Sequence, residues 1–281
     1  MLKLFTGMAL ALTIGTALEA QCRTSDFPDP AGPVAAPTRP TESFPADPIQ
    51  TGVVQLESGW THTWYAGESS QNALPTMVRY GVWCNMELRW NANLYVSESN
   101  GSVTNTGFGD NSVGVQYRFV RESAHRPALA FAYSMKFPTA DLSEGLGSGK
   151  RDQVFTLIAS KTIRGFSVVV NASYFSIGQP LGGSDGKGEW TLAVSHTLKG
   201  RLGAEGEVFG DSRLNAANVG YTDSTWAFTY SVSRRVVIDA GTYVGLTSGP
   251  GAPGKSAFAG ITYALAELYP ARRPRMVANK N

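Results

Sequence analysis

Residues 86–97 read MELRWNANLYVS, and in this stretch apolar and polar side chains alternate. Every second residue is apolar: Leu88, Trp90, Ala92, Leu94 and Val96. The residues between them are polar or charged: Glu87, Arg89, Asn91 and Asn93. A period of two residues is typical of a β-strand whose two faces meet different surroundings. The stretch therefore predicts a strand with one apolar and one polar face.

The same alternation recurs along the chain from Gly52 onward, for example at Val113, Val115, Tyr117 and Phe119, with polar residues or glycine between them. We expect about twelve such strands. They are predicted near residues 52–65, 73–83, 86–97, 110–121, 127–138, 151–162, 165–177, 187–198, 201–212, 223–233, 236–247 and 255–266.

The predicted connections alternate between short and long. Tight turns such as 83–85, 164–165, 199–200 and 234–235 are separated by longer loops rich in Gly, Ser and Asn. An even strand number with short turns at one end and long loops at the other is typical of bacterial outer-membrane barrels. A soluble sandwich would show the same alternation of side chains, but it has no reason to alternate its loop lengths. The sequence thus predicts an all-β fold, a transmembrane antiparallel up-and-down β-barrel over residues 51–266.

The N-terminus resembles an export signal. A positive start, Met1-Leu2-Lys3, precedes an uncharged apolar run from Leu4 to Leu18, and Ala20 offers a small residue for cleavage. The run is too short to span a bilayer comfortably as a helix, so residues 1–20 are predicted to be a cleaved signal peptide. At the other end, residues 267–281 are predicted to form a basic periplasmic tail. The expected location is the outer membrane of a Gram-negative bacterium.

Residues 21–50 are rich in proline and have no apolar periodicity. Two alternatives remain open for them: a disordered periplasmic lead-in, or a plug inside the barrel in which Arg39 and Glu42 meet charges of the wall. The chain has two cysteines, Cys22 and Cys84. Both would lie in the oxidising periplasm, where disulfides persist, so they are a candidate disulfide or else two unpaired thiols.

Short motifs in a fixed order resemble an outer-membrane transporter family named for the meta-pathway of phenol degradation, over residues 38–266. The motifs are Thr38-Arg39-Pro40-Thr41-Glu42-Ser43, Gly52 to Gly59, Arg79-Tyr80-Gly81 with Met86 to Arg89, Gly107 to Asp110 with Gly114 to Arg118, Phe137-Pro138-Thr139 with Asp141, and Ser160-Lys161-Thr162. The chain departs from the family at Thr41, where an acidic residue is usual. The resemblance implies a barrel that passes small hydrophobic or aromatic compounds.

Charged residues on the inward face are candidates for lining the lumen: Glu57, Arg79, Glu87, Arg89, Arg118, Lys136, Glu189, Glu205, Glu207 and Asp239. Enclosed charges must be paired or hydrated. They predict either an ion-pair network that braces a closed lumen or a narrow polar path that selects a solute. If a path exists, Arg79, Arg89 and Arg118 on neighbouring strands would form a basic wall, which Glu57 and Glu87 could partly neutralise. This wall would lie opposite Glu205, Glu207 and Asp239.

The sequence offers little support for an enzyme. Histidine occurs three times, and Ser195 beside His196 would point to the opposite face of its strand. No cluster has metal-ligand spacing, so neither a metal nor a cofactor is expected, and a formal net charge of +2 gives no reason to expect nucleic-acid binding.

The predicted function is a channel or transporter that passes small, aromatic or hydrophobic molecules by passive diffusion. The alternatives are a structural or surface barrel with a closed, ion-paired lumen and, less favoured, an outer-membrane hydrolase. Its expected partners are outer-membrane lipid, the barrel-assembly machinery during biogenesis and a small-molecule solute.

Overall fold

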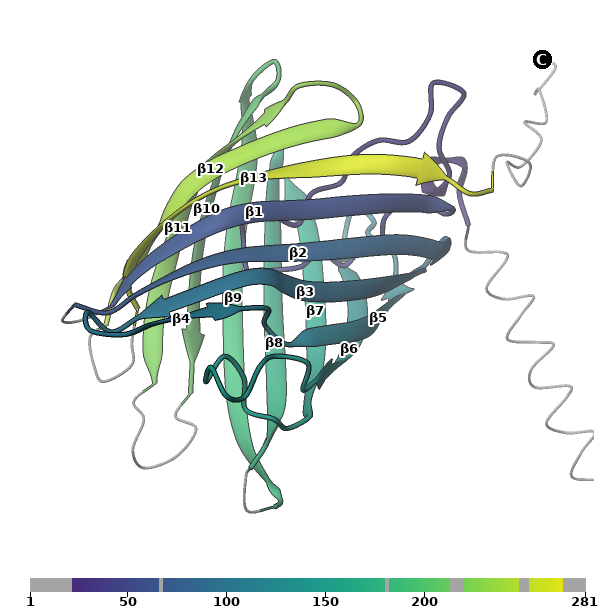
Figure 1. The fold of residues 1–281 in the computed structure, drawn as a ribbon. Helices are drawn as coiled ribbons and strands as arrows, with labels where there is room; N and C mark the ends of the chain where they lie inside the picture. Colours follow the sequence, from purple (N-terminus) through teal and green to yellow (C-terminus); the bar gives the residue numbers. More distant parts are fainter. Residues whose placement is uncertain (1–21, 66–67, 180–181, 213–219, 248–252, 270–281) are drawn as a thin grey trace, which may run out of the picture.

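The structure is a computed structural model that describes residues 22–65, 68–179, 182–212, 220–247 and 253–269. The described residues form a short 3-10 helix, η1 (Thr24–Asp26), and one antiparallel sheet (Figure 1). The strands are β1 (Val53–Tyr65), β2 (Ser70–Trp83), β3 (Met86–Ser99), β4 (Thr104–Gly107), β5 (Asn111–Val120), β6 (Ala128–Phe137), β7 (Asp152–Ile163), β8 (Phe166–Gly178), β9 (Ser184–Lys199), β10 (Leu202–Asp211), β11 (Tyr221–Ser231), β12 (Val236–Gly245) and β13 (Pro253–Glu267).

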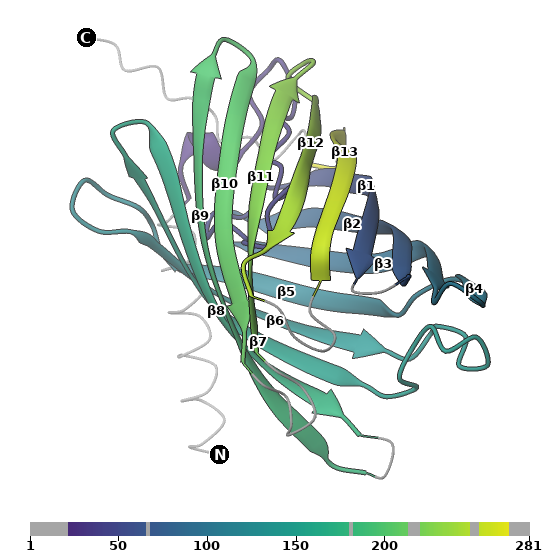
Figure 2. The same ribbon diagram turned by 90° about the vertical axis from the view of Figure 1, so that its left-hand side faces the viewer.

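The sheet closes into a barrel because β1 pairs with both β2 and β13 (Figure 2). Twelve long strands form the wall, and the short β4 pairs with the outer end of β3. The predicted fold class is therefore confirmed, and each long strand begins and ends within three residues of its expected bounds. Two details were wrong: β4 lies in a stretch expected to be loop, and Glu267, expected in the tail, is the last residue of β13.

Connections differ between the two ends of the barrel, which we call the short-turn end and the long-loop end. Arg164 and Gly165 form one of the tight turns, with φ values of 53° and 86°. Two consecutive residues with positive φ are what a two-residue hairpin turn of type I′ requires, because its twist matches that of the flanking strands. This explains the Arg-Gly pair between β7 and β8.

Alternating side chains separate an apolar outer surface from a polar interior. On β3, Leu88, Trp90 and Leu94 are exposed on the outside, whereas Glu87 and Arg89 are buried on the inside. Apolar residues on the outside of a closed barrel are stable when they face the hydrocarbon of a bilayer. No helix among the described residues has the length and apolar character needed to cross a membrane. The predicted signal peptide lies outside the described residues, as does the basic tail from residue 270 onward.

A charged side chain on this outer surface should lower the free energy of unfolding, and by more the closer it lies to the middle of the bilayer. Phe228 is 59% exposed near the middle of β11, and Val232 lies on the same face just beyond the end of that strand. Phe228→Arg is expected to destabilise the barrel by about 2–4 kcal/mol, and Val232→Arg by about 0–1 kcal/mol. Urea unfolding in lipid vesicles, followed by heat-modifiability on gels, measures both values. Equal losses would show that this face does not contact lipid.

Candidate functional site

The chain that precedes β1 crosses the short-turn end before it enters the barrel. A disulfide joins Cys22 to Cys84 in the β2–β3 turn, with the Cα atoms 5.4 Å apart. Asp26 then pairs with Arg121 at 2.6 Å, which ties the segment to the end of β5. Arg234 pairs with Asp29 at 2.9 Å, so residues 22–35 are held against the rim of the barrel at several points.

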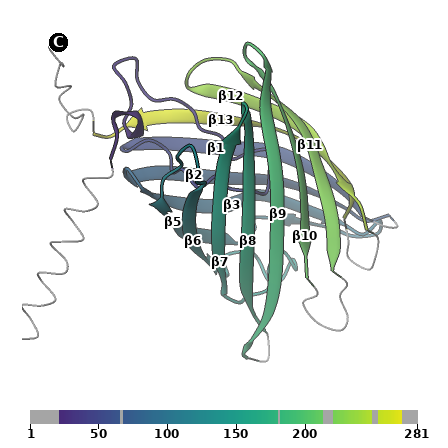
Figure 3. The same ribbon diagram turned by 180° about the vertical axis from the view of Figure 1, so that it is seen from behind.

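Residues 36–50, which we call the lumen segment, continue around the inside of the wall, behind β1 and β2 in the view of Figure 1 and seen from the other side in Figure 3. Successive residues bond to side chains of successive strands. The contacts are Thr38 with Glu57 of β1, Arg39 with Asp239 of β12, Ser43 with Glu207 of β10, Phe44 with Asn171 of β8, Ala46 with Ser160 of β7, and Ile49 with Glu87 of β3. Of the two alternatives left open for residues 21–50, this placement is that of the lumen plug.

Acidic side chains of the wall accept hydrogen bonds from backbone N–H groups of the lumen segment. Glu57 accepts from Thr38 at 2.9 Å, and Glu207 accepts from Glu42 and Ser43 at 2.8 Å each. A segment without regular secondary structure leaves its backbone donors unpaired, and a buried unpaired donor is costly. The carboxylates therefore replace the β-ladder that the lumen segment does not form.

Room for the lumen segment is made by glycines of the wall. Arg39 pairs with Asp239 at 3.2 Å, and its guanidinium lies over Gly59 and Gly260, which face one another across β1 and β13. A Cβ atom at either glycine would collide with that guanidinium. Glycine in a strand often marks such a close approach of another chain segment.

Arg79 is at the centre of a buried ion-pair network on β1–β3. Its guanidinium bonds to Glu57 at 3.2 Å and to Glu87 at 2.8 Å. Arg89 bonds to the second oxygen of Glu87 at 2.6 Å and donates to the amide oxygen of Gln116 on β5. Arg79, Glu57 and Glu87 are each no more than 1% exposed, so this network is enclosed by the wall and the lumen segment.

The structure corrects the expectation of a basic wall. Arg118 pairs with Asp47 of the lumen segment and donates to the carbonyl oxygen of Cys84 at 2.7 Å. Like Arg79 and Arg89, Arg118 is buried and paired. Glu57 and Glu87 were inward candidates in the sequence, whereas Asp47 was not. The three arginines therefore brace the lumen segment, and none of them lines the larger cavity described below.

The remaining predicted residues also face the interior. Lys136 pairs with Asp110 at 2.9 Å and with Asp152 at 2.7 Å, which joins β6 to β7 and to the start of β5. Glu189 lines the cavity described next, and Glu205 lies on the inward face of β10 two residues before Glu207.

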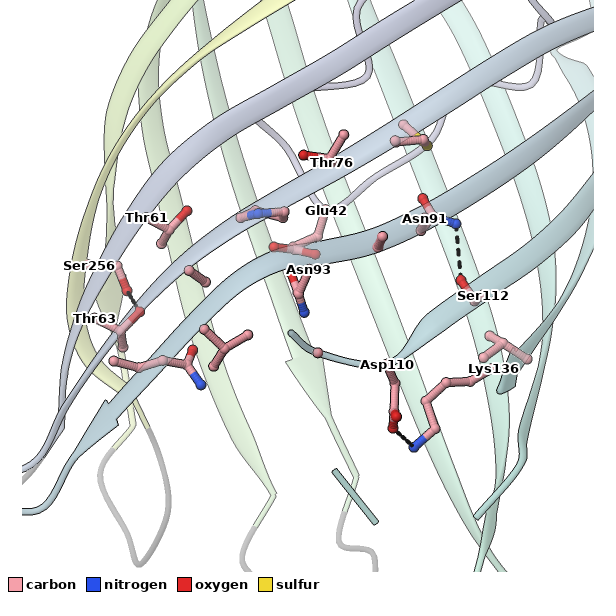
Figure 4. Close-up of a pocket in the computed structure, with 18 of the residues that line it drawn as sticks. Glu42, Thr61, Thr63, Thr76, Asn91, Asn93, Asp110, Ser112, Lys136 and Ser256 are labelled. Atoms are coloured by element: carbon pink, nitrogen blue, oxygen red, sulfur yellow. Dashed lines mark hydrogen bonds and ion pairs between the residues drawn. The ribbon is translucent and has the colours of Figure 1, made fainter. Parts of the chain in front are cut away.

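A cavity of about 890 Å³, which we call the vestibule, extends from the lumen segment toward the long-loop end. Arg39, Glu42 and Phe44 form its floor, and inward residues of the wall form its sides. In Figure 4, Glu42 points into the vestibule, and the Asp110–Lys136 pair lies on its side. Such a volume is in the range of pockets that enclose small organic molecules.

A second, smaller cavity of about 230 Å³ lies at the short-turn end, lined by Asp47 to Gln50 of the lumen segment and by Arg118 and Arg121. Its lining shares no residue with that of the vestibule. Ala46 between them packs on Ala128, Ala130 and Ile158 of the wall. The lumen segment thus separates the two cavities.

Several residues that contact the lumen segment or face the interior of the barrel were not among the candidates predicted from the sequence. Asn171, Ser160 and Asp47 contact the lumen segment or belong to it, and Asp211 and Asp223 lie inward near the long-loop end. The inward position of Asp223 could have been predicted, because it is an even number of residues away from the inward residues of β11. It stands at the predicted end of that strand, next to a stretch expected to be loop.

The described histidines give no support to hydrolase chemistry. His62 hydrogen-bonds to Asn72 at 2.7 Å, and His196 to the carbonyl oxygen of Gly165 at 3.0 Å. A Ser–His nucleophile needs a hydrogen bond between the two side chains, and neither of these histidines is bonded to a serine. Among the described residues, no group of three or more His, Cys, Asp and Glu has the arrangement of a metal site.

Comparisons with known proteins agree with this geometry. A family model described as MetA-pathway of phenol degradation matches residues 39–258. No significant match was found among curated protein sequences. An outer membrane channel from Pseudomonas putida F1 has the same fold, with a TM-score of 0.63 and 10% identity over 82% of this chain and 99% of that chain. The NanC porin is also similar, with a TM-score of 0.53 and 10% identity over 75% of this chain and all of that chain.

Proposed function

The chain belongs to the family described as MetA-pathway of phenol degradation, and on this premise we propose that it is an outer-membrane channel for small, aromatic or hydrophobic molecules. The channel is passive, and the vestibule is its mouth. The short-turn end then faces the periplasm, as short turns do in bacterial barrels, and the vestibule faces the outside of the cell.

The vestibule is the observation that carries this proposal. Barrels of eight strands are filled by their own side chains, and barrels of 16 to 18 strands leave an open channel. This twelve-stranded barrel holds a cavity of about 890 Å³ in one half and a segment of chain in the other. The lumen segment is held mainly through wall side chains, so its displacement breaks no strand pairing. Passage then requires only that this segment shifts.

The rival function is a structural barrel whose lumen stays closed. The observation that favours it is the separation of the two cavities, together with the buried bonds of Arg79 and Arg118 around the lumen segment. The two functions differ in one respect that can be measured, which is whether a solute crosses the protein.

Swelling of liposomes that contain the purified protein distinguishes the two functions. With phenylalanine as the solute, which is aromatic and as a zwitterion crosses lipid slowly, vesicles with the wild-type chain are expected to swell faster than empty vesicles, because this solute enters through the barrel. Vesicles with heat-unfolded protein serve as the control. Swelling at the rate of empty vesicles, together with no single-channel conductance in planar bilayers, would establish the closed barrel.

Export through a cleaved signal peptide belongs to the same proposal. Cleavage after Ala20 would leave Cys22 near the start of the mature chain, where its disulfide to Cys84 requires an oxidising compartment such as the periplasm. Folding by the barrel-assembly machinery follows from export. The intact mass of the protein extracted from outer membranes tests the cleavage site.

A further inference from the structure

Carboxyl groups crowd one corner of the vestibule, where β9, β10 and β11 approach the long-loop end. Asp211 is paired across the sheet with Glu189 on one side and with Tyr221 on the other. Asp223 lies inward two residues after Tyr221. Directly paired residues have Cα atoms about 4.5–5.5 Å apart, so Glu189 and Asp211 are close neighbours. Asp223 lies diagonally across from Asp211, because its direct partner is Phe209. We call Glu189, Asp211 and Asp223 the acidic corner.

Positive charge does not balance this corner among the described residues. Lys187 bonds to Oδ2 of Asp211 at 2.5 Å and is the ammonium group that reaches the corner there. Glu42 adds a further carboxyl group from the floor of the vestibule, within electrostatic range of Glu189. Arg39 lies within electrostatic range of Glu42 but pairs with Asp239, so among the described residues Lys187 is the cation bonded to the three acids of the corner.

Asp223 supports a ligand at the acidic corner independently of the number of charges there. It is 2% exposed, it lines the vestibule, and its Oδ1 atom is buried without a hydrogen-bond partner in the described part of the chain. Oδ1 of Asp211 is also buried without a hydrogen-bond partner among the described residues, although Asp211 itself does not line the vestibule. Leaving a buried polar atom without a partner is unfavourable, and more so for a charged group. A ligand that donates hydrogen bonds would satisfy such acceptors beside a cavity.

Aromatic rings complete the corner. Phe209 is the cross-strand partner of Asp223, and its ring meets that of Tyr243 edge to face with centroids 6.1 Å apart. Both rings line the vestibule, as does that of Tyr221. Ring faces attract cations, and flat apolar rings also pack against one another.

We propose that the acidic corner binds small organic ammonium ions, with an N–H group donating to Asp223 and the organic part packed on Phe209 and Tyr243. This inference rests on the proposed function, whose solute class it narrows to cations that carry N–H donors. Carboxyl groups this close retain protons when no cation joins them, and a cation that donates hydrogen bonds favours their charged form. An anion or a neutral molecule gives no such compensation.

Isothermal titration calorimetry of the detergent-purified full chain tests the proposal, with benzylammonium chloride as the probe. Benzoate has a similar size and the opposite charge, and benzyltrimethylammonium keeps the ring and the charge but lacks the N–H donors. Benzylammonium is expected to bind at least tenfold more tightly than benzyltrimethylammonium, and benzoate is expected not to bind. A loss of about 1.4 kcal/mol is one factor of ten, and a charged hydrogen bond contributes about that much or more.

Variants locate the site within the vestibule. Asp223→Asn keeps the shape of the side chain and is expected to weaken benzylammonium binding about tenfold or more. Glu98→Gln makes the same change of charge at an exposed residue elsewhere in the vestibule and should leave the affinity within twofold of wild type. Glu189→Gln provides a second variant of the corner if Asp223→Asn does not fold, as judged by heat-modifiability.

The outcomes separate this inference from the channel proposal, because calorimetry in detergent requires no open path. Unchanged affinity in the folded corner variants, or an equal loss in Glu98→Gln, would overturn the acidic corner as a site even if the protein conducts. Binding that depends on Asp223 in a protein without permeation would keep the site and overturn the channel.

Discussion

Arg79→Ala is expected to destabilise the folded barrel by about 3–5 kcal/mol, which is the usual cost of breaking a buried ion pair from one side. The guanidinium of Arg79 bonds to Glu57, to Glu87 and to the carbonyl oxygen of Ala36, and it is 1% exposed. Alanine would leave two carboxylates enclosed without that cation. Urea unfolding of the protein in lipid vesicles measures the loss.

Arg234→Ala is the matched control for this prediction. Arg234 pairs with Asp29 at 2.9 Å, but both side chains are about half exposed at the rim of the barrel. Exposed pairs of this kind contribute about 0–1 kcal/mol. Adding Glu57→Gln to Arg79→Ala should recover part of the stability, because Glu57 has no other ion-pair partner among the described residues, whereas Glu87 keeps its pair with Arg89. A loss of the same size in Arg79→Ala and Arg234→Ala would show that the network is hydrated and not buried.

The wall of this barrel could be predicted from the sequence because each strand encodes its own two faces. Glu87 and Arg89 are inward and Leu88 and Trp90 are outward for a local reason, since neighbouring residues of a strand point to opposite sides. The alternation can be recognised in each strand without knowing which strand pairs with it. It therefore predicted the number of long strands and their approximate ends. β4 was missed because four residues of mixed polarity are too few to show a period.

The partners of the inward charges could be predicted only in part. Glu57 and Glu87 were inward candidates near the arginines, but the partners that the lumen segment supplies depend on distant parts of the chain. Arg79 and Arg89 are directly opposite one another in the β2–β3 register, as a basic ladder requires. The structure places Glu87 between their guanidinium groups, and the lumen segment supplies Asp47 to Arg118. The acceptor of Arg39 is 200 residues away.

For a similar reason, the sequence alone could not decide whether the lumen segment enters the barrel. Proline-rich chain without apolar periodicity is typical of disordered linkers as well as of irregular segments inside a barrel. The information that distinguishes them is distributed over the wall. Gly59 and Gly260 leave space, and Glu57 and Glu207 supply acceptors. None of these four residues identifies the contact by itself.

A disulfide that fixes the lumen segment to the wall is expected to abolish permeation through the channel. Oγ of Ser43 lies 2.8 Å from Oγ1 of Thr191 on β9, which places the two Cβ atoms within reach of a disulfide in Ser43→Cys/Thr191→Cys. The native cysteines are replaced by Cys22→Ser/Cys84→Ser to prevent mispairing. When oxidised, this protein should swell liposomes at the rate of empty vesicles, and dithiothreitol should restore the rate of the reduced protein. The reason is that the lumen segment separates the two cavities and must shift before a solute can pass.

The single variant Ser43→Cys in the same background is the control, because it carries one thiol and can form no intramolecular lock. Its swelling rate should not respond to oxidant or to dithiothreitol, which separates locking from any effect of the reagents on the vesicles. Equal permeation by the locked and reduced proteins would mean that solutes pass beside a fixed lumen segment, so that the constriction is formed by the wall. If the locked protein is closed and the reduced protein is open, the rate-limiting event is displacement of residues 36–50. The bonds of Glu207 and Arg118 to that segment would then set how often the channel opens.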